Sequence, residues 1–318
     1  MTAGQNPFAR FLESQGVVIL DGGLATTLED MGCTLDAKLW SAGLLRHDPG
    51  AVVTAHRAFL EAGADCIATV GYQASFPGCS ELGLSDAESV SLLEQTVQLA
   101  VEARDIFWSD PMNRAGRERP LVAASVGPYG AYLGDGSEYH GRYDIDRAAL
   151  ADFHRRRFQL FANSAADLVA CETIPSGEEA EVLLEILADT PTAWAWISFS
   201  CRDGGHLHDG TPIGEVVRLC EDAERVAAIG VNCTAPAHVT HLIDAMRSET
   251  TLPILAYPNS GEGYDAESKD WTGGRSDVDL VALAEAWVAS GAEGVGGCCR
   301  VGPELIRALR GRFVGASA

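Results

Sequence analysis

Lysine is nearly absent from this chain of 318 residues. Only Lys38 and Lys269 occur, and neither ends an apolar run of the kind that forms a strand, so a Schiff-base lysine enzyme is not expected. Basic residues are few in general, since 23 Lys and Arg stand against 45 Asp and Glu, for a formal net charge of −22. A surface this acidic repels nucleic-acid backbones and anionic lipids, which argues against both as partners.

Long apolar segments and several common enzyme motifs are also missing. No apolar run is long enough to span a bilayer. The N-terminal stretch MTAGQNPFARFLESQG has neither the basic start nor the apolar core of a signal peptide, so we expect a cytoplasmic location. The patterns G-x-x-x-x-G-K-[ST], G-x-G-x-x-G, H-E-x-x-H and G-x-S-x-G do not occur, which argues against the nucleotide-binding, zincin and α/β-hydrolase classes that carry them.

Cysteine, in contrast, is frequent. The nine cysteines are an odd number with no signal peptide before them, so a disulfide framework is not expected. Most lie inside apolar runs, as Cys66 and Cys171 do, and are interpreted as small core residues. The adjacent pair Cys298 and Cys299 needs a separate explanation.

Short apolar runs alternate with longer segments of helical periodicity along the whole chain. The runs are apolar at consecutive positions, which is typical of parallel strands that are covered on both faces. The predicted strands are Val17–Leu20, Cys66–Thr69, Leu121–Val126, Leu168–Ala170, Ala195–Phe199, Ala227–Val231, Ile254–Ala256 and Gly294–Gly296. The predicted helices are Ala51–Leu60, Glu88–Phe107, Arg147–Ala162, Glu178–Leu187, Ile213–Ala223, His238–Met246, Val278–Ala289 and Pro303–Arg310.

Eight strands, each followed by a helix, predict a single (β/α)₈ TIM barrel over residues 1–318. A doubly wound sheet is the alternative. Two connections are long, Met31–Pro49 after the first strand and Gly127–Asp144 after the third. Both are expected at the C-terminal rim, where barrel enzymes build their sites.

Polar residues and glycines follow the predicted strands and should therefore meet at one mouth of the barrel. The candidate substrate-binding residues chosen on this basis are Asp21, Gly22, Gly23, Thr69, Tyr72, Gln73, Ser125, Glu172, Asn232 and Tyr257. Tyr129 is a further aromatic candidate for the pocket wall.

Three cysteines at this mouth favour a metal site. Cys298 and Cys299 follow the eighth strand and Cys233 follows the sixth, while Gly296 and Gly297 allow the bend that turns adjacent thiols toward one ion. Soft thiolates select zinc, and a catalytic zinc has three protein ligands and one open position. Two alternatives remain from the pattern alone: buried cysteines beside an unrelated third, or a redox protein with a disulfide between Cys298 and Cys299.

Asp21 and Glu172 are carboxylates at strand ends, where an ammonium group of an amino-acid substrate is one suitable partner. Gly22 and Gly23 would let backbone amides approach a substrate carboxylate. A barrel enzyme that acts on an amino acid through these carboxylates without zinc is a further possibility. His206 and His208, in the Cys201–Pro212 loop, are interpreted as polar loop residues and not as a second metal site.

The sequence resembles the homocysteine S-methyltransferase family. The resemblance rests on LDGGLATTLEDMGC, TVGYQASFPG, ASVGPYGAYLGDGSEYHGRY, CETIPSGEEAE, DGTP, GVNC, YPNSGEGYD and GGCCR, and it runs in order from about Val17 to Arg310. Within that family the likeness is to the bacterial and plant-type enzymes that use S-methylmethionine. One departure is Gly71, where relatives often have a small polar residue.

The resemblance implies a (β/α)₈ barrel in which Cys233, Cys298 and Cys299 bind Zn²⁺. It also implies that Asp21 and Glu172 receive the amino group of homocysteine, with Thr69 and the amides of Gly22 and Gly23 nearby. The implied reaction moves a methyl group from a sulfonium donor to homocysteine and forms methionine. S-methylmethionine is the expected donor, S-adenosylmethionine is the second choice, and other small-molecule thiols or selenols are open as acceptors.

Overall fold

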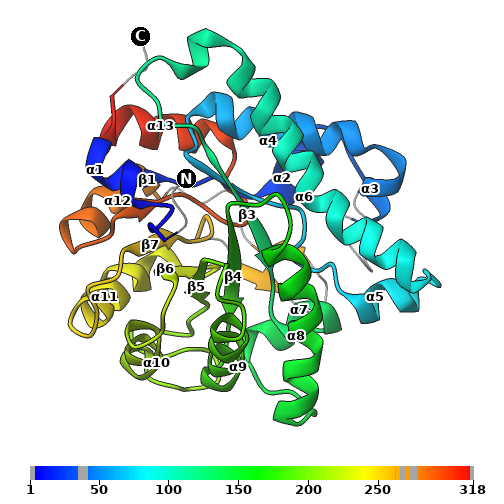
Figure 1. The fold of residues 1–318 in the computed structure, drawn as a ribbon. Helices are drawn as coiled ribbons and strands as arrows, with labels where there is room; N and C mark the ends of the chain where they lie inside the picture. Colours follow the sequence, from blue (N-terminus) through cyan, green and yellow to red (C-terminus); the bar gives the residue numbers. More distant parts are fainter. Residues whose placement is uncertain (1–3, 35–41, 262, 266–269, 273–277, 316–318) are drawn as a thin grey trace.

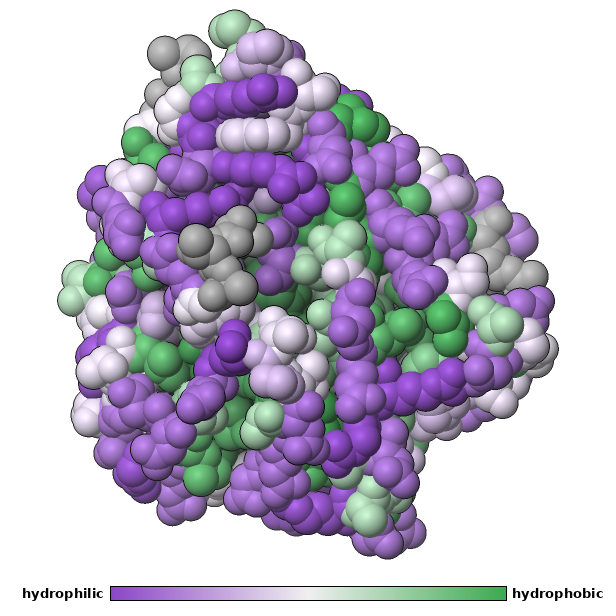
Figure 2. Space-filling view, viewed as in Figure 1, coloured by the Kyte–Doolittle hydropathy of each residue, from purple (hydrophilic) through white to green (hydrophobic). Residues whose placement is uncertain are grey.

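The computed structural model describes residues 4–34, 42–261, 263–265, 270–272 and 278–315. Both lysines, Lys38 and Lys269, lie outside the described residues, as does part of the long connection predicted after the first strand. Hydrophilic side chains cover most of the face seen in Figure 2, in keeping with the net charge of −22. No helix in the described part of the chain combines the length and the apolar character needed to cross a membrane.

Eight parallel strands form the central sheet, in the order β1-β10-β7-β6-β5-β4-β3-β2. The strands are β1 Val18–Ile19, β2 Cys66–Ala68, β3 Leu121–Val126, β4 Leu168–Ile174, β5 Ala195–Phe199, β6 Val226–Asn232, β7 Ile254–Tyr257 and β10 Gly294–Val295. A parallel bridge between Leu20, just after β1, and Cys66 joins the two ends of the sheet. The sheet is thus a closed (β/α)₈ barrel, which confirms the predicted fold, and the doubly wound alternative is wrong.

Helices surround the strands (Figure 1). They are α1 Ala9–Gln15, α2 Leu24–Asp30, α3 Ala42–His47, α4 Pro49–Ala62, α5 Phe76–Glu81, α6 Asp86–Ser109, α7 Tyr129–Leu133, α8 Arg147–Ala162, α9 Gly177–Ala188, α10 Ile213–Glu221, α11 Pro236–Arg247, α12 Leu280–Ala289 and α13 Pro303–Phe313. Short 3₁₀ turns occur at η1 Pro111–Arg114 and η2 Ser137–Tyr139, and β8 Gly263–Asp265 pairs with β9 Asp270–Thr272 as an antiparallel hairpin.

The strands of the barrel contribute to two apolar layers, because successive side chains of each strand point to opposite faces. On β3, Leu121 and Ala123 belong to the cluster inside the barrel, whereas Val122 and Ala124 belong to the layer between strands and helices. Phe8 and Phe11 also join the inner cluster. The N-terminal segment therefore fills the inside of the barrel with aromatic rings.

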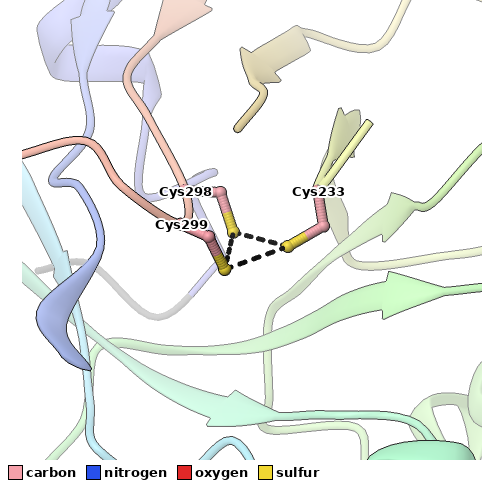
Figure 3. Close-up of side chains that lie close together, drawn as sticks. All are labelled: Cys233, Cys298 and Cys299. Atoms are coloured by element: carbon pink, nitrogen blue, oxygen red, sulfur yellow. Dashed lines mark hydrogen bonds between the residues drawn. The ribbon is translucent and has the colours of Figure 1, made fainter. Parts of the chain in front are cut away.

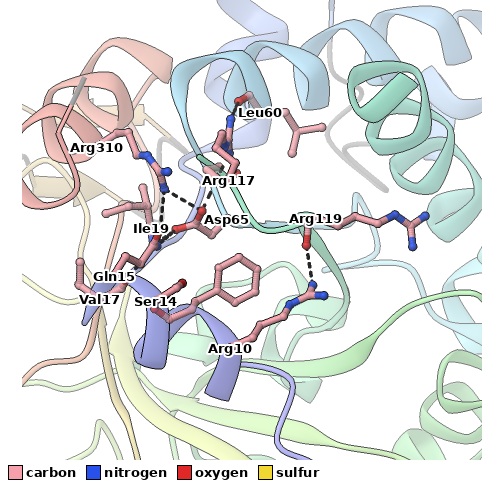
Figure 4. A network of polar contacts seen from close by, with 12 residues as sticks. Arg10, Ser14, Gln15, Val17, Ile19, Leu60, Asp65, Arg117, Arg119 and Arg310 are labelled. Atoms are coloured by element: carbon pink, nitrogen blue, oxygen red, sulfur yellow. Dashed lines mark hydrogen bonds and ion pairs between the residues drawn. The ribbon is translucent and has the colours of Figure 1, made fainter. Parts of the chain in front are cut away.

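A buried carboxylate holds the first and last elements of the barrel together (Figure 4). Asp65, directly before β2, is fully buried and accepts hydrogen bonds from the backbone amide of Ile19 on β1, at 3.0 Å, and from Gln15 on α1. The guanidinium of Arg310 on α13 lies 2.8 Å from the same carboxylate. Burial raises the pKa of Asp65, and the charge of Arg310 opposes that shift.

Candidate metal centre and substrate pocket

Three thiols meet at the C-terminal mouth of the barrel (Figure 3). Cys233 follows β6, and Cys298 and Cys299 follow β10. The Sγ atom of Cys233 lies 2.7 Å from that of Cys298 and 3.8 Å from that of Cys299, and the two adjacent cysteines are 3.9 Å apart at sulfur. All nine cysteines are free. The predicted cysteine cluster is therefore present, and its thiols are unbonded, so the structure shows no disulfide between Cys298 and Cys299.

The backbone around this cluster is held in an unusual conformation. Cys233, Arg300 and Thr173 have positive φ angles of 45°, 66° and 63°, which residues with a side chain rarely adopt. A Cβ atom on Gly297 would lie 2.1 Å from the Val301 side chain, so only glycine fits this bend. Strained residues of this kind persist where the surrounding structure fixes them, and they gather at functional sites.

A cavity of about 360 Å³ opens beside the thiols. The predicted residues that line it are Asp21, Gly22, Gly23, Thr69, Tyr72, Gln73, Glu172, Asn232, Cys233, Tyr257, Cys298 and Cys299. Ser125 lies behind this lining, where its hydroxyl donates a hydrogen bond to Glu172. Tyr129 is not at the pocket, since its ring packs among Tyr132, Tyr143 and Phe153.

Asp21 and Glu172 bring two buried carboxyl groups to this cavity. The Oδ2 atom of Asp21 accepts a hydrogen bond from the amide of Ala68 at 2.8 Å, and Glu172 accepts from Ser125 and, at 3.4 Å, from Tyr257. Burial raises the pKa of Asp21 well above its usual range and that of Glu172 to about 7. Arg300 lines the same cavity, but no ion pair joins Asp21 or Glu172 to a cationic side chain among the described residues, so a structural ion pair does not account for them.

The comparison with known proteins gives one consistent result. The sequence profile of the homocysteine S-methyltransferase family matches residues 18–313.

The chain belongs to the homocysteine S-methyltransferase family.

Homocysteine S-methyltransferase YbgG of Bacillus subtilis is 44% identical over 304 residues, which cover 96% of each chain. The selenocysteine Se-methyltransferase of Brassica oleracea is also 44% identical and covers 95% of this chain and 90% of its own. The crystal structure of the homocysteine methyltransferase MmuM from Escherichia coli, in its metallated form, superposes with a TM-score of 0.86 at 40% identity, covering 96% of this chain and 100% of that one.

In this family member, Asn232 contacts the chain itself from the barrel interior. Its Oδ1 atom accepts hydrogen bonds from the amide of Thr173 and the hydroxyl of Ser198, both at 2.8 Å. Its Nδ2 atom donates to the hydroxyl of Thr173 at 2.7 Å and lies 3.9 Å from the sulfur of Cys298. Asn232 is fully buried, so its polar atoms bind the ends of β4 and β5 and leave little for a substrate.

Contrary to the expectation from the sequence, the backbone amide of Gly23 is not free to bind a substrate carboxylate. Its amide donates to the carbonyl of Val301 at 2.8 Å and is therefore engaged within the chain. A Cβ atom on Gly23 would lie 2.7 Å from the carbonyl oxygen of Cys298. This glycine lets the turn after β1 pack against the cysteine turn, which is a different task from holding a substrate carboxylate.

Gln73 and Tyr72 form another part of the wall, after β2. The Oε1 atom of Gln73 is buried and has no hydrogen-bond partner in the described part of the chain. A buried acceptor of this kind is costly unless a ligand or water donates to it, which fits a binding role for Gln73.

One wall of the cavity, from the 127–144 connection, is not predicted by the sequence pattern. Gly134, Gly136 and Tyr139 line the cavity from this segment, and the ring of Tyr139 packs edge-on against His208 with centroids 5.8 Å apart. His206, by contrast, lies 3.0 Å from Asp203 at Nδ1. The length of the connection and its place at the rim were the available signals, but they did not single out Tyr139.

Proposed function

We propose that this protein is a zinc-dependent homocysteine S-methyltransferase, which moves a methyl group from a sulfonium donor to the thiol of L-homocysteine and forms methionine. The observation that carries the proposal is the cluster of three thiols beside a cavity with two buried carboxyl groups, neither of which is ion-paired among the described residues. Membership in the homocysteine S-methyltransferase family supports the choice of reaction.

The donor set of the cluster fits zinc. A tetrahedral zinc with bonds of about 2.3 Å to sulfur places two sulfurs about 3.8 Å apart. The distances from Cys299 to Cys233 and Cys298 are 3.8 and 3.9 Å, and the remaining pair, at 2.7 Å, would open by roughly 1 Å. Three thiolates leave the fourth position open to a substrate, as catalytic sites do. The metallated form of the Escherichia coli relative supports a metal here.

When bound, zinc would supply a substrate thiol as its thiolate at neutral pH, whereas a free thiol has a pKa of about 8.5. The chain's own residues orient the acceptor. The carboxyl groups of Asp21 and Glu172 are suited to the ammonium group of homocysteine, which provides the missing positive charge. Ser125 and Tyr257 keep Glu172 in place by donating hydrogen bonds to it.

A sulfonium donor matches the groups that are present. The bond between the methyl carbon and the donor sulfur breaks as the bond to the acceptor sulfur forms, and the electron pair stays on a neutral thioether. No general acid is needed for that leaving group, and charge is neutralised along the path, which a pocket with little water favours. Tyr72 and Tyr139 line the same cavity, and aromatic rings are suited to a cationic sulfur.

S-methylmethionine is the proposed donor. A cavity of about 360 Å³ lies near the low end of ligand pockets, which run from about 300 to 1,000 Å³. Homocysteine and S-methylmethionine are both small, whereas S-adenosylmethionine brings an adenosine for which the chain has no nucleotide-binding motif. With this donor each turnover yields two molecules of methionine.

We further propose that residues 1–318 work as one domain with small-molecule substrates only, in the cytoplasm. Nine free cysteines, three of them at the proposed site, support a reducing compartment.

The test is metal content together with donor rates for the purified, reduced protein. We expect one zinc per chain and the highest kcat/KM with S-methylmethionine among four donors, the others being S-adenosylmethionine, betaine and methyltetrahydrofolate. Cys299→Ser should lose both zinc and turnover, because serine is a poor zinc ligand. Cys33→Ser, a half-buried cysteine outside the cluster, is the matched control and should keep both. Full zinc and turnover in Cys299→Ser would reject the ligand assignment, and preference for betaine would reject the sulfonium donor.

A further inference from the structure

A buried network of polar and charged side chains lies behind the part of the pocket that the 127–144 connection forms. Its centre is Glu179, which lies in the first turn of α9 and is fully buried. One carboxylate oxygen of Glu179 accepts a hydrogen bond from the amide of Tyr129 at 2.6 Å, and the other accepts from the hydroxyl of Tyr143 at 2.9 Å. The two tyrosines stand at opposite ends of the segment that places Gly134, Gly136 and Tyr139 at the cavity.

Arg157 on α8 extends the network to two strand ends. Its guanidinium donates to the carbonyl of Gly127, after β3, at 2.6 Å and to the carbonyl of Ala74, after the Tyr72–Gln73 wall, at 3.0 Å. The side chain is 1% exposed, and burial lowers its pKa to about 10. One guanidinium thus contacts both loops that form this side of the pocket.

His154 connects the two charged groups. Its Nδ1 atom lies 3.2 Å from Arg157, which can only donate, so Nδ1 accepts and Nε2 carries the proton. Nε2 then donates to Glu179 at 2.8 Å. The ring is neutral in this arrangement, in agreement with a pKa that burial lowers. Every polar contact of the triad therefore has a defined direction.

Burying such a network has a cost in free energy, since apolar side chains of equal volume are often as stabilising. The contacts lead to backbone groups of the pocket loops: the amide of Tyr129 and the carbonyls of Gly127 and Ala74. Close packing completes the arrangement, because a Cβ atom on Gly130 would lie 2.3 Å from the amide nitrogen of Glu138. The segment between Gly127 and Tyr143 is therefore folded tightly on itself and held from behind.

We propose that Glu179, with His154 and Arg157, is a positioning residue that fixes the 127–143 segment as the wall of the donor side of the pocket. The assignment to the donor rests on the proposed function, in which the acceptor is bound by the strand-end residues Asp21 and Glu172. The triad does not touch substrate; it acts through Tyr139 and the glycines of the segment.

Tyr143→Phe tests the proposal with a small change. It removes the hydroxyl that donates a hydrogen bond to Glu179. Tyr132→Phe is the matched control on the same segment, because the hydroxyl of Tyr132 donates to Glu81 at 2.6 Å on the surface and does not contact the triad. Hydrogen exchange of the amides between residues 130 and 141 is the direct readout. We expect faster exchange there in Tyr143→Phe and wild-type exchange in Tyr132→Phe. Equal exchange in the two variants would overturn the proposal.

Kinetics provide the second readout. Loss of one hydrogen bond at the wall should raise KM for S-methylmethionine about five- to tenfold in Tyr143→Phe, with KM for homocysteine and zinc content unchanged. Equal changes in both KM values, or none, would reject the donor-side role. If the wild-type protein transferred no methyl group from any sulfonium, the proposed function would fail, while the exchange data would still decide whether the triad fixes the segment.

Two substitutions of Glu179 test whether its hydrogen bonds hold the 127–143 segment. Glu179→Gln keeps an oxygen for Tyr129 and His154 and offers an N–H to the Tyr143 oxygen, so it should preserve most of the slow exchange. Glu179→Ala removes all three contacts and should lose it. A Glu179→Gln variant with exchange as fast as Glu179→Ala would contradict the network as described.

Discussion

At the scale of single residues, Asp21 and Glu172 are the most informative groups, because neither forms an ion pair within the part of the chain that the structure describes. Two carboxyl groups that are 8% and 9% exposed would normally be paired with arginine or lysine. Their pKa values are raised instead, so a bound ammonium group would complete the site.

Glu172→Gln tests this assignment. The amide keeps the size of the side chain but removes the negative charge, so homocysteine should bind about 10- to 100-fold more weakly, or about 1–3 kcal/mol. The measurement is KM for homocysteine beside that for a simple alkyl thiol, which has no ammonium group and should be little affected. Equal losses for both thiols would indicate a structural role for Glu172.

His56 on α4 is a second residue with a testable consequence. It is fully buried, neither ring nitrogen has a partner among the described residues, and burial lowers its pKa from 6.5 to about 4. The unfolded chain binds the proton first as the pH falls. Above pH 6.5 the residue therefore leaves stability unchanged, and between pH 6.5 and 4 it progressively destabilises the folded state.

We expect His56 to account for a loss of about 2 kcal/mol in the free energy of unfolding between pH 7.5 and pH 5. Urea unfolding of wild type and His56→Leu at both pH values isolates this part, because all other titrating groups are shared. The variant should lose less stability than wild type over that interval. An identical pH dependence of the two proteins would show that His56 is not buried as a neutral ring.

Some residues of the site can be predicted from the sequence, and others cannot. Cys233, Cys298 and Cys299 could be chosen because strands six and eight lie close together in a barrel, and because GVNC and GGCCR resemble motifs of the family. Tyr139 could not, because it lies in a long connection whose path depends on contacts with Glu179 and His208. The role of Asn232 was also hidden, since the pattern places it at a strand end but does not say that its amide binds Thr173.

At the scale of elements, Asp65 joins α1, β1 and α13 at the closure of the barrel. This closure needs support, because β1 and β10 have only two residues each. The contacts of the Asp65 carboxylate therefore stabilise the closure of the barrel, where the strands offer few backbone hydrogen bonds.

Asp65→Asn should lower the free energy of unfolding by about 3 kcal/mol, because it leaves the buried Arg310 without a counter-charge. Asp105→Asn is the matched control: its side chain is 53% exposed beside Arg119, and the loss should stay below about 1 kcal/mol. Chemical denaturation of both variants at neutral pH gives the two values. Similar small losses would mean that the contacts of β1 alone close the barrel.

The strands were predictable because a short run of consecutive apolar residues is typical of a parallel strand that is covered on both faces. Leu121–Val126 matches its prediction from end to end. β4 is longer than predicted and includes Glu172 and Thr173, since polar residues at its end are bonded to Ser125 and Asn232. The short helices α1, α2, α3, α5 and α7 were not predicted. With five to seven residues each, they are too short for helical periodicity and depend on caps and packing.

At the scale of the whole molecule, a metal at the cysteine cluster would link β6 to β10, two strands separated in the barrel only by β7. A ligand that binds only the folded state adds to stability. We expect chelation to lower the free energy of unfolding by about 3 kcal/mol relative to zinc at a hundredfold excess over its Kd.

Thermal unfolding with chelator, and again after zinc is restored, measures this effect. The Tm should fall and then recover in wild type, whereas Cys299→Ser should give the lower value throughout. A Tm that does not respond to chelator or to zinc would contradict the linkage of metal binding to folding.

The order of the three cysteines along the chain has a consequence for biosynthesis. Cys233 is made early enough to fold with its neighbours, but Cys298 and Cys299 come only with the last strand of the barrel, which also pairs with the first. A ribosome that stops anywhere before residue 298 leaves at most one thiol of the three. Only completed chains would then bind the metal at all three thiols. Prematurely terminated chains would lack the metal and would leave the edge of β1 unpaired, which exposes them to cellular proteases.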